Sequence, residues 1–363
     1  MAYDQQQFRA LTGIRAIAAF MVFFNHLPLH LYFPFFQYLQ AGFSSGVSLF
    51  FVLSGFLITY RYYNDFSFSE DWFAKYFIRR FARIYPVYFF LVTIVLITSA
   101  PHNLGYIVEN YTLTHSLFNY GDIAISPSWS LTVEECFYLS APIIFLLIRK
   151  YGVWSPLVIY IVVLSTILLL RDNKPNVFVA NHYMFMLTYI GRFFEFYMGV
   201  ALGMRFLTGK ISVRKTGNYT YMGLTGILLV ILCIGGTLLL HGTIRLMTTQ
   251  MLFNIALPFP VVVFYRGLCT ENTAVSRFLS GNSMNLFGKS SYTFYLLHML
   301  IIGPAHAFTN LFTGIRYDVL VVSEFCITLI LSIIIYLLFE HPANLHIKRL
   351  LLPRKNTMKY ENI

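Results

Sequence analysis

The stretch LTGIRAIAAFMVFFNHLPLHL, residues 11–31, decides the class of this fold. It is apolar and long enough to cross a bilayer as a helix, for which about 20 residues suffice. It nevertheless contains Arg15 and His26. Eleven helical steps of about 100° place both side chains on one face, about 16 Å apart along the axis. Because a charged Arg in hydrocarbon costs around 3 kcal/mol on insertion scales, this pair predicts a membrane enzyme or transporter rather than a passive anchor.

The composition also indicates a membrane protein. The 363-residue chain is 57% hydrophobic and 11% charged, and its mean hydropathy is +0.65, whereas a soluble domain carries about 25% charged residues. The apolar runs predict an all-α, polytopic integral membrane protein with about ten transmembrane helices, forming one domain over residues 1–363. The predicted helices are roughly 11–31, 42–60, 84–100, 131–148, 154–170, 187–206, 221–240, 248–265, 286–304 and 319–339.

The net charge of +11 follows from topology. With the N-terminus inside, most Lys and Arg fall in predicted cytoplasmic loops, and the outer loops hold only Arg171, Lys174, Arg245 and Arg316. This positive-inside pattern predicts that both termini are cytoplasmic. We therefore expect a multi-pass protein of the inner (plasma) membrane, in contact with membrane lipids and with no nucleic-acid partner.

The four cysteines lie in or beside hydrophobic runs, with no close pair among Cys136, Cys233, Cys269 and Cys326. They predict small buried side chains, and neither a disulfide set nor a metal site. No cleavage site follows the first apolar stretch, which is therefore expected to remain as a signal anchor.

A predicted cytoplasmic segment from Arg61 to Arg83 ends in IRRFARIYP. Arg80 and Arg83 are three residues apart and share a face if this segment is helical, whereas Arg79 points elsewhere. Guanidinium groups bind phosphate oxygens in a bidentate manner, so the pair suits a phosphate group at the inner surface. Plain topological charge or contact with lipid head groups is the alternative. Pro86 fits the start of a new helix.

A predicted outer segment, residues 101–130, contains no Lys or Arg and leads into SPSWSLTVEECFYL. Ser130 and Glu134 are one helical turn apart at the start of the next span, beside Trp129, which is typical of an interfacial aromatic residue. Capping of the helix dipole explains one of the two acids Glu134 and Glu135. It explains both less well, because one must turn toward the protein interior.

A second intramembrane histidine, His298, lies about twelve residues into the helix that contains GKSSYTFYLLHMLI, or about 18 Å deep. His26 lies about 22 Å deep in the first helix, so the two can meet. Lys289, Tyr292 and Tyr295 extend the polar stripe of His298. A backbone carbonyl can satisfy a lone buried histidine, but a set of this kind favours a functional role.

Six segments together resemble acyltransferase family 3 of polytopic membrane proteins: LTGIRAIAAFMVFFNH, GVSLFFVLSGFLI, RRFARIYP, SWSLTVEECFY, GKSSYTFYLLH and FEHP. They occur in family order between residues 11 and 342. The resemblance implies a helical core that takes an acyl group from cytoplasmic acyl-CoA and delivers it to a carbohydrate hydroxyl across the membrane. We expect a stand-alone enzyme, similar to O-antigen and exopolysaccharide O-acetyltransferases, without the extracytoplasmic hydrolase-like domain of many relatives.

The resemblance also implies site residues. His26 and Glu134 are the expected catalytic residues, and the donor acetyl-CoA, or another acyl-CoA, is expected at Arg15, Arg80 and Arg83. Substrate-binding or supporting roles are expected for Ser130, Trp129, Tyr292, Tyr295 and His298. The family opening often reads Leu-Asp-Gly-Leu-Arg, whereas Thr12 replaces the acid here.

Two mechanisms and three classes of protein fit these residues. His26 either acts as general base on the acceptor hydroxyl in a ternary complex, or is transiently acylated, which gives ping-pong kinetics. The competing class is a secondary transporter that uses intramembrane His, Arg and Glu residues for substrate or proton binding. An Arg pair beside a helix end favours the acyl-CoA enzyme. A structural or sensory membrane protein is the third class.

Overall fold

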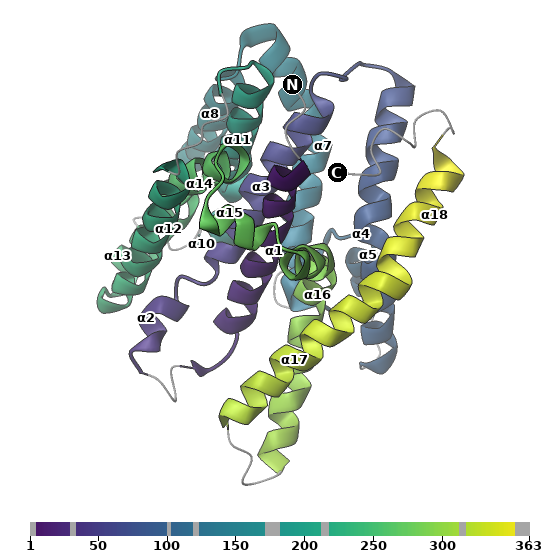
Figure 1. Ribbon diagram of the computed structural model, residues 1–363, viewed down its shortest axis with the longest axis vertical. Coiled ribbons are helices and arrows are strands. Elements are labelled where there is room, and N and C mark those ends of the chain that lie inside the picture. The colour runs from purple at the N-terminus through teal and green to yellow at the C-terminus, as the bar shows by residue number, and fades with distance from the viewer. Residues whose placement is uncertain are drawn as a thin grey trace. The chain divides into compact units, whose positions relative to one another are not determined.

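The computed structural model describes residues 5–29, 34–99, 103–118, 123–170, 182–211, 218–311 and 317–352. These residues are all-helical and contain no strand, as predicted. Figure 1 shows their helices, which divide into two compact units. Unit 1 comprises Met1–Leu27, Ser67–Thr132 and Leu279–Ile363, and unit 2 comprises Pro28–Phe66 and Val133–Phe278.

Seven helical segments in the described part of the chain are long and apolar enough to cross a membrane. Each predicted apolar range overlaps a helix. The helix over the predicted range 154–170, Ser155–Leu170, is apolar but shorter than these seven. The number of crossings and the side on which the termini lie stay predictions. Arg171, Lys174 and Arg316 of the predicted outer loops lie outside the described residues.

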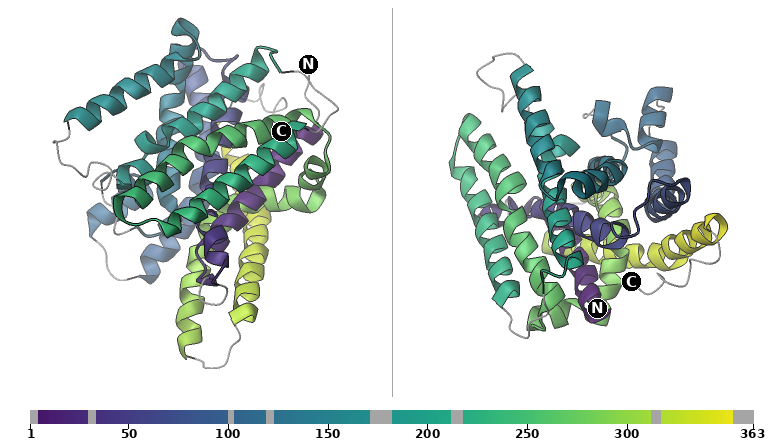
Figure 2. Two further views of the ribbon diagram at one scale, coloured as in Figure 1. Left: turned by 90° about the vertical axis from the view of Figure 1, so that its left-hand side faces the viewer. Right: turned by 90° about the horizontal axis from the view of Figure 1, so that it is seen from above.

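Unit 1 contains the long helices α1 (Gln5–Asn25), α4 (Glu70–Thr98), α16 (Asn282–Leu311), α17 (Tyr317–Ile335) and α18 (His341–Leu351). Shorter elements are α5 (Leu104–Tyr111), α6 (His115–Phe118) and the 3₁₀ turn η2 (Ser126–Ser128). A π-helical turn, η5 (Tyr336–Glu340), joins α17 to α18. Helix α16 lies beside α17 and packs along α1, and α18 lies beside α4 (Figures 1 and 2).

Backbone contact at Gly288 sets the register between α1 and α16. A Cβ atom at this position would lie 1.9 Å from the carbonyl oxygen of Thr12, so a larger residue would push the helices apart. The ring of Phe20 packs nearby against Phe294 and Phe325, with centroids 5.2 and 5.0 Å away. This close approach fixes the alignment of the two helices, and with it the position of His26, just after the end of α1, relative to His298, midway along α16.

Helix α1 ends at Asn25, so the prediction that the first helix continues to Leu31 is wrong. Pro28 explains the end, because it disfavours helical backbone in the residue before it and lacks an N–H to extend the helix. The N–H of His26 donates to the Phe23 carbonyl oxygen at 3.1 Å. His26 therefore lies directly after the last turn rather than within a longer helix.

Helix α4 begins at Glu70 and runs through Pro86 to Thr98, so the predicted helix start at Pro86 is also wrong. The side chain of Ser69 caps the true start by accepting a hydrogen bond from the Trp72 N–H at 3.3 Å. Glu70 and Asp71 in the first turn complement the helix dipole. The Arg80–Arg83 pair therefore lies inside a helix.

Pro86 is tolerated because another helix supplies the hydrogen bond that it removes. Proline has no N–H to donate to the carbonyl of Ala82, one turn earlier. Nδ2 of Asn344 on α18 donates to this oxygen instead, at 2.8 Å. The contact satisfies a backbone group that apolar surroundings would leave unpaired, and it holds α18 on α4.

Unit 2 contains α3 (Ser45–Tyr62), most of α7 (Trp129–Tyr151), α8 (Ser155–Leu170), α11 (Tyr189–Leu207), α12 (Asn218–Gly236) and α14 (Pro258–Thr270). Shorter elements are α2 (Phe36–Gln40), α10 (His182–Leu187), η3 (Thr237–Leu239), α13 (Gly242–Met251), the π-helical turn η4 (Leu252–Ala256) and α15 (Ala274–Leu279). Helices α3 and α11 meet backbone to backbone, because a Cβ at Gly199 would lie 2.0 Å from the Val52 carbonyl oxygen. Helix α12 packs along α14.

All four cysteines are free, as predicted. The expectation that they are buried is wrong for Cys233 and Cys326, which are exposed, whereas Cys269 is buried. Cys233 lies on a face of α12 that also exposes Leu229 and Leu232. Such a face suits surrounding lipid, where a thiol is tolerated as a small apolar group.

We predict that Asn344→Leu lowers the stability of the protein by about 1 kcal/mol, because the Ala82 carbonyl loses its donor. In a Pro86→Ala background, a backbone N–H at position 86 is available, so the same change at Asn344 should cost little. Thermal unfolding of the four proteins in one detergent measures this cycle. Equal losses in the two backgrounds would contradict the proposed pairing.

Candidate functional site

Two histidine rings meet in unit 1, as the predicted depths require. The ring centroids of His26 and His298 are 5.1 Å apart. Nδ1 of His26 lies 2.9 Å from the Val22 carbonyl oxygen, and Nδ1 of His298 lies 2.6 Å from that of Tyr295. A carbonyl oxygen only accepts, so each Nδ1 carries the hydrogen. In each neutral ring the lone pair is therefore on Nε2.

The two rings differ in exposure. His26 is exposed, whereas His298 is fully buried. Nε2 of His298 has no hydrogen-bond partner among the described residues. His26 is thus the accessible ring of the pair, and His298 lies behind it. The arrangement offers one accessible general base backed by a second imidazole.

Tyrosines hold the helix that carries His298. The Tyr295 ring lies 5.7 Å from that of His298, and its Oη is 2.8 Å from Oγ of Ser130. The Tyr292 hydroxyl donates to the Ile84 carbonyl oxygen at 2.8 Å, which ties α16 to α4. The structure therefore places Tyr295 against His298 and Ser130 against Tyr295, whereas Tyr292 contacts α4. Lys289, the fourth member of the stripe, is exposed.

A charged cluster in unit 1 joins Arg15 on α1, Arg83 on α4 and Glu340 on the π-helical turn. The Glu340 carboxylate accepts a hydrogen bond from Oγ1 of Thr293 at 2.6 Å and interacts with the charges of Arg83 and Arg15. Tyr336, on the same turn, interacts with the same charges. Opposite charges at short range stabilise one another more strongly here than in water, because the surroundings are less polar.

Glu340 is a residue that sequence reasoning missed. It lies in the FEHP segment, which contributed to the family resemblance but was given no role. The available signal was an acid in an apolar stretch, which is costly and therefore points to function. Thr12, which stands where the family often has an acid, donates to the Phe8 carbonyl oxygen at 3.2 Å. The acid beside Arg15 instead comes from the opposite end of the chain.

Arg80 is buried on α4, one turn before Arg83. Trp129, the first residue of α7, is partly buried, and Ser130 beside it is buried. The predicted donor and supporting residues Arg15, Arg80, Arg83, Ser130, Trp129, Tyr292, Tyr295 and His298 thus all belong to unit 1, together with His26.

Glu134 belongs to unit 2. Its Oε1 accepts hydrogen bonds from Oγ of Ser54 on α3 and from the Tyr138 hydroxyl, one turn further along α7. The first turn of α7 contains no acid, so dipole capping does not account for Glu134. Ser54 lies in the GVSLFFVLSGFLI segment but was not predicted as a partner. The expected catalytic role of Glu134 stays a prediction.

Arg192, the other arginine of a predicted apolar helix, is held inside unit 2. Its guanidinium donates to Oε1 of Glu195 at 2.9 Å, to Oδ1 of Asn254 at 3.1 Å and to the Met186 carbonyl oxygen at 2.6 Å. Asn254 lies in the π-helical turn η4. The donors of Arg192 are thus directed at protein acceptors, which indicates a structural clamp rather than a substrate site.

His115 anchors the predicted outer segment to the start of α7. It is buried, and its Nε2 lies 3.2 Å from Oγ of Ser128, the last residue of η2. The Tyr88 hydroxyl donates to the Asn110 carbonyl oxygen at 2.7 Å and secures the same segment to α4. Burial lowers the pKa of His115 to about 4. The segment therefore depends on a neutral imidazole.

We predict that His115 makes the protein less stable in acid. An unfolded histidine has a pKa of about 6.5. As the pH falls from 6.5 toward 4, the unfolded state binds a proton that the folded state does not, so stability is lost over this range and is unaffected above it. His115→Gln should flatten the fall in unfolding temperature between pH 7 and pH 4.5, and the exposed His346→Gln should not. An unchanged pH dependence in His115→Gln would refute this role.

Comparison with known proteins finds relatives that include two O-acetyltransferases and a further acyltransferase. The chain is similar to peptidoglycan O-acetyltransferase OatA of Listeria monocytogenes, 31% identical over 168 residues that cover 41% of this chain and 26% of that protein. It is similar to acyltransferase MdmB of Streptomyces mycarofaciens, 32% identical over 165 residues that cover 40% of this chain and 41% of that protein. It is also similar to O-acetyltransferase OatA of Staphylococcus aureus, 24% identical over 332 residues that cover 83% of this chain and 51% of that protein.

The chain thus spans about a quarter to a half of the length of these relatives. No solved structure matches it. A family model described as an acyltransferase domain matches residues 8–341. Because this match covers nearly the whole chain, this multi-pass membrane protein belongs to acyltransferase family 3.

Proposed function

We propose that this protein is a membrane O-acyltransferase that moves an acetyl group from cytoplasmic acyl-CoA to a hydroxyl of a surface carbohydrate, such as lipid-linked O-antigen or exopolysaccharide. The observation that carries the proposal is that one compact unit holds an accessible imidazole and a cluster of arginines. Relatives named O-acetyltransferases support the acetyl group and the hydroxyl acceptor. The relative named for peptidoglycan supports a cell-surface glycan.

The residues proposed to bind acyl-CoA are assigned from the charges of three arginines and from the distance between Arg15 and His26. Arg15, Arg80 and Arg83 suit the phosphates of CoA, which are too polar to enter the membrane. Arg15 and His26 have ten residues between them. The distance is about 16 Å along a helix, which is on the scale of the pantetheine arm. The phosphates would then stay at the inner end of α1 while the thioester reaches His26.

The chemistry requires one proton acceptor. Nε2 of His26 takes the proton of the acceptor hydroxyl as its oxygen attacks the thioester carbonyl carbon. The C–S bond then breaks, and the CoA thiolate takes the proton back from the imidazolium. The products are the O-acetyl ester and free CoA, with no net proton. A ternary complex is required for this route, whereas acylation of His26 itself would give ping-pong kinetics.

The acceptor side is assigned to Glu134. Its side chain is held by Ser54 and Tyr138 near the outer end of α7 in the proposed topology. A carboxylate in this position can accept hydrogen bonds from sugar hydroxyls. Glu134 is thereby given a role in binding the acceptor rather than the donor.

We predict that His26→Ala abolishes acetyl transfer while acyl-CoA affinity stays within about twofold of the unaltered protein, a difference of about 0.4 kcal/mol. Mass spectrometry of surface glycans from cells with the gene, without it and with the variant measures transfer. Equal amounts of protein in the membrane are the control. A variant that retains a tenth or more of the transfer would exclude His26 as the base.

We predict that Arg83→Ala and Arg80→Ala each weaken acyl-CoA binding through a lost charge-assisted contact of about 1.5–3 kcal/mol. Binding to the unaltered protein should also weaken with added salt. Glu134→Gln is the matched control, since it removes a charge on the proposed acceptor side and should leave acyl-CoA affinity unchanged. Unchanged affinity in both arginine variants would support a purely topological role for these charges.

A further inference from the structure

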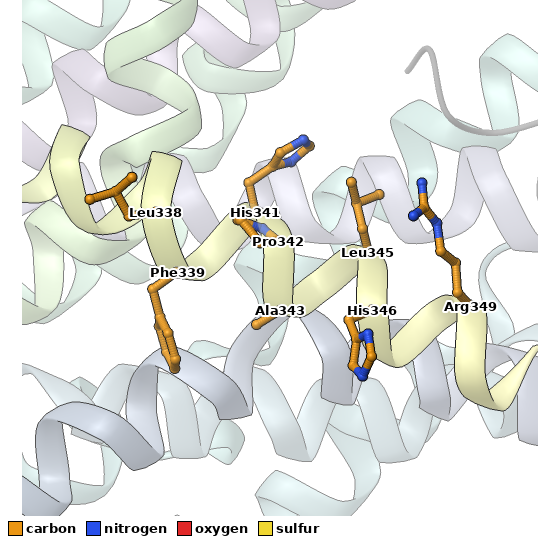
Figure 3. Close-up of a pocket in the computed structure, with 8 residues that line it drawn as sticks. All are labelled: Leu338, Phe339, His341, Pro342, Ala343, Leu345, His346 and Arg349. Atoms are coloured by element: carbon orange, nitrogen blue, oxygen red, sulfur yellow. The ribbon is translucent and has the colours of Figure 1, made fainter.

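The C-terminal helix α18 presents a basic stripe beside the donor arginines. Figure 3 shows His341, Leu345 and Arg349 projecting from one side of this helix, and Phe339 and His346 from the opposite side. Residues four apart fall on one face, so the stripe follows the helix for two turns. From His341 to Arg349 it extends about 12 Å. Arg349 is exposed at its far end.

The near end of the stripe adjoins the charged cluster. The ring of His341 packs against that of Tyr336, with centroids 5.7 Å apart, and Tyr336 interacts with the charges of Arg15 and Arg83. The Asn344–Ala82 hydrogen bond holds α18 on α4 at the same level. The charged cluster thus lies at one end of α18 and Arg349 lies near the other end, both within unit 1.

The stripe borders a groove that can take a nucleotide. The groove has a volume of about 570 Å³, within the range of small-molecule sites. Its lining combines apolar Leu338 and Leu345 with His341 and Arg349. A nucleoside phosphate requires an apolar surface for its nucleobase and cationic side chains for its phosphate.

The length of the last span places this groove outside the hydrocarbon. The apolar segment Tyr317–Leu351 has 35 residues and would extend about 52 Å as a helix, against about 30 Å of bilayer core. Its basic end, with Lys348 and Arg349 in the last turn, is the part that should emerge. In the proposed topology it emerges on the cytoplasmic side, where CoA is found.

We propose that Arg349 binds the 3′-phosphate on the ribose of CoA, while the Arg15–Arg83 cluster at the other end of α18 faces the diphosphate. This rests on the proposed function, because it assumes that CoA is the donor. The 3′-phosphomonoester is attached to the ribose next to the diphosphate and needs a cation of its own at a short distance from the first. A lipid head group is the other source of phosphate chemistry for such a stripe, and dephospho-CoA, which lacks only the 3′-phosphate, separates the two.

The test compares the binding of CoA and dephospho-CoA to the purified full-length protein in detergent and in nanodiscs with and without anionic lipid. The unaltered protein should prefer CoA about tenfold, and Arg349→Gln should remove this preference by weakening CoA alone. Arg205→Gln, which removes an exposed arginine on α11 that does not line this groove, is the matched control and should leave both affinities unchanged.

Three results would overturn the assignment. The unaltered protein could bind CoA and dephospho-CoA equally well, or Arg349→Gln could weaken the binding of both ligands equally. The third result is that Arg349→Gln weakens CoA binding only in anionic nanodiscs, which would make Arg349 a lipid contact. Each of these leaves acyl-CoA as the donor as long as CoA still binds. Failure of the unaltered protein to bind either ligand would instead refute the donor and, with it, the proposed function.

Discussion

The absence of water around most of this chain is the constraint on which the rest of the structure depends, because each polar group must find a partner within the protein. The carbonyl of Ala82 shows the consequence. Pro86 removes its helical donor, and Asn344 replaces that donor from a helix more than 250 residues further along the chain. One backbone oxygen thus fixes α18 against α4. The position of Glu340, at the start of α18, follows from that contact.

Two π-helical turns place polar side chains with different consequences. In unit 2, η4 supplies Asn254 to Arg192, whose charge is already balanced by Glu195. In unit 1, η5 supplies Glu340, a single carboxylate, to two guanidinium groups. Among these three unit 1 residues one positive charge is left over, which suits an anionic ligand, whereas the unit 2 cluster is neutral. Such turns are frequent at functional sites. The difference in net charge distinguishes the structural clamp around Arg192 from the candidate site around Glu340.

Local sequence patterns were sufficient for much of the fold and for part of the site. Apolar runs located the helices, and helical rise alone brought His26 and His298 to one depth. The predicted end of the first helix was wrong because the local effect of Pro28 was not applied, and the predicted start at Pro86 was wrong because a distant contact overrides a local rule. Pro86 is a strong helix-start signal, and it fails because Asn344 compensates for the lost donor. Glu340 could not be assigned because its partners lie on α1 and α4, and their proximity depends on packing that a single sequence does not specify.

The two histidines are best understood as one base. Each ring donates Nδ1–H to a carbonyl of its own helix, and each keeps its lone pair on Nε2. Two imidazolium charges with ring centroids 5.1 Å apart would repel each other, which disfavours protonation of both rings at once. Burial of His298 makes the exposed ring the one that meets substrate, while the glycine contact between α1 and α16 prevents the rings from drifting apart. A transferase that takes and returns a single proton requires no more than this.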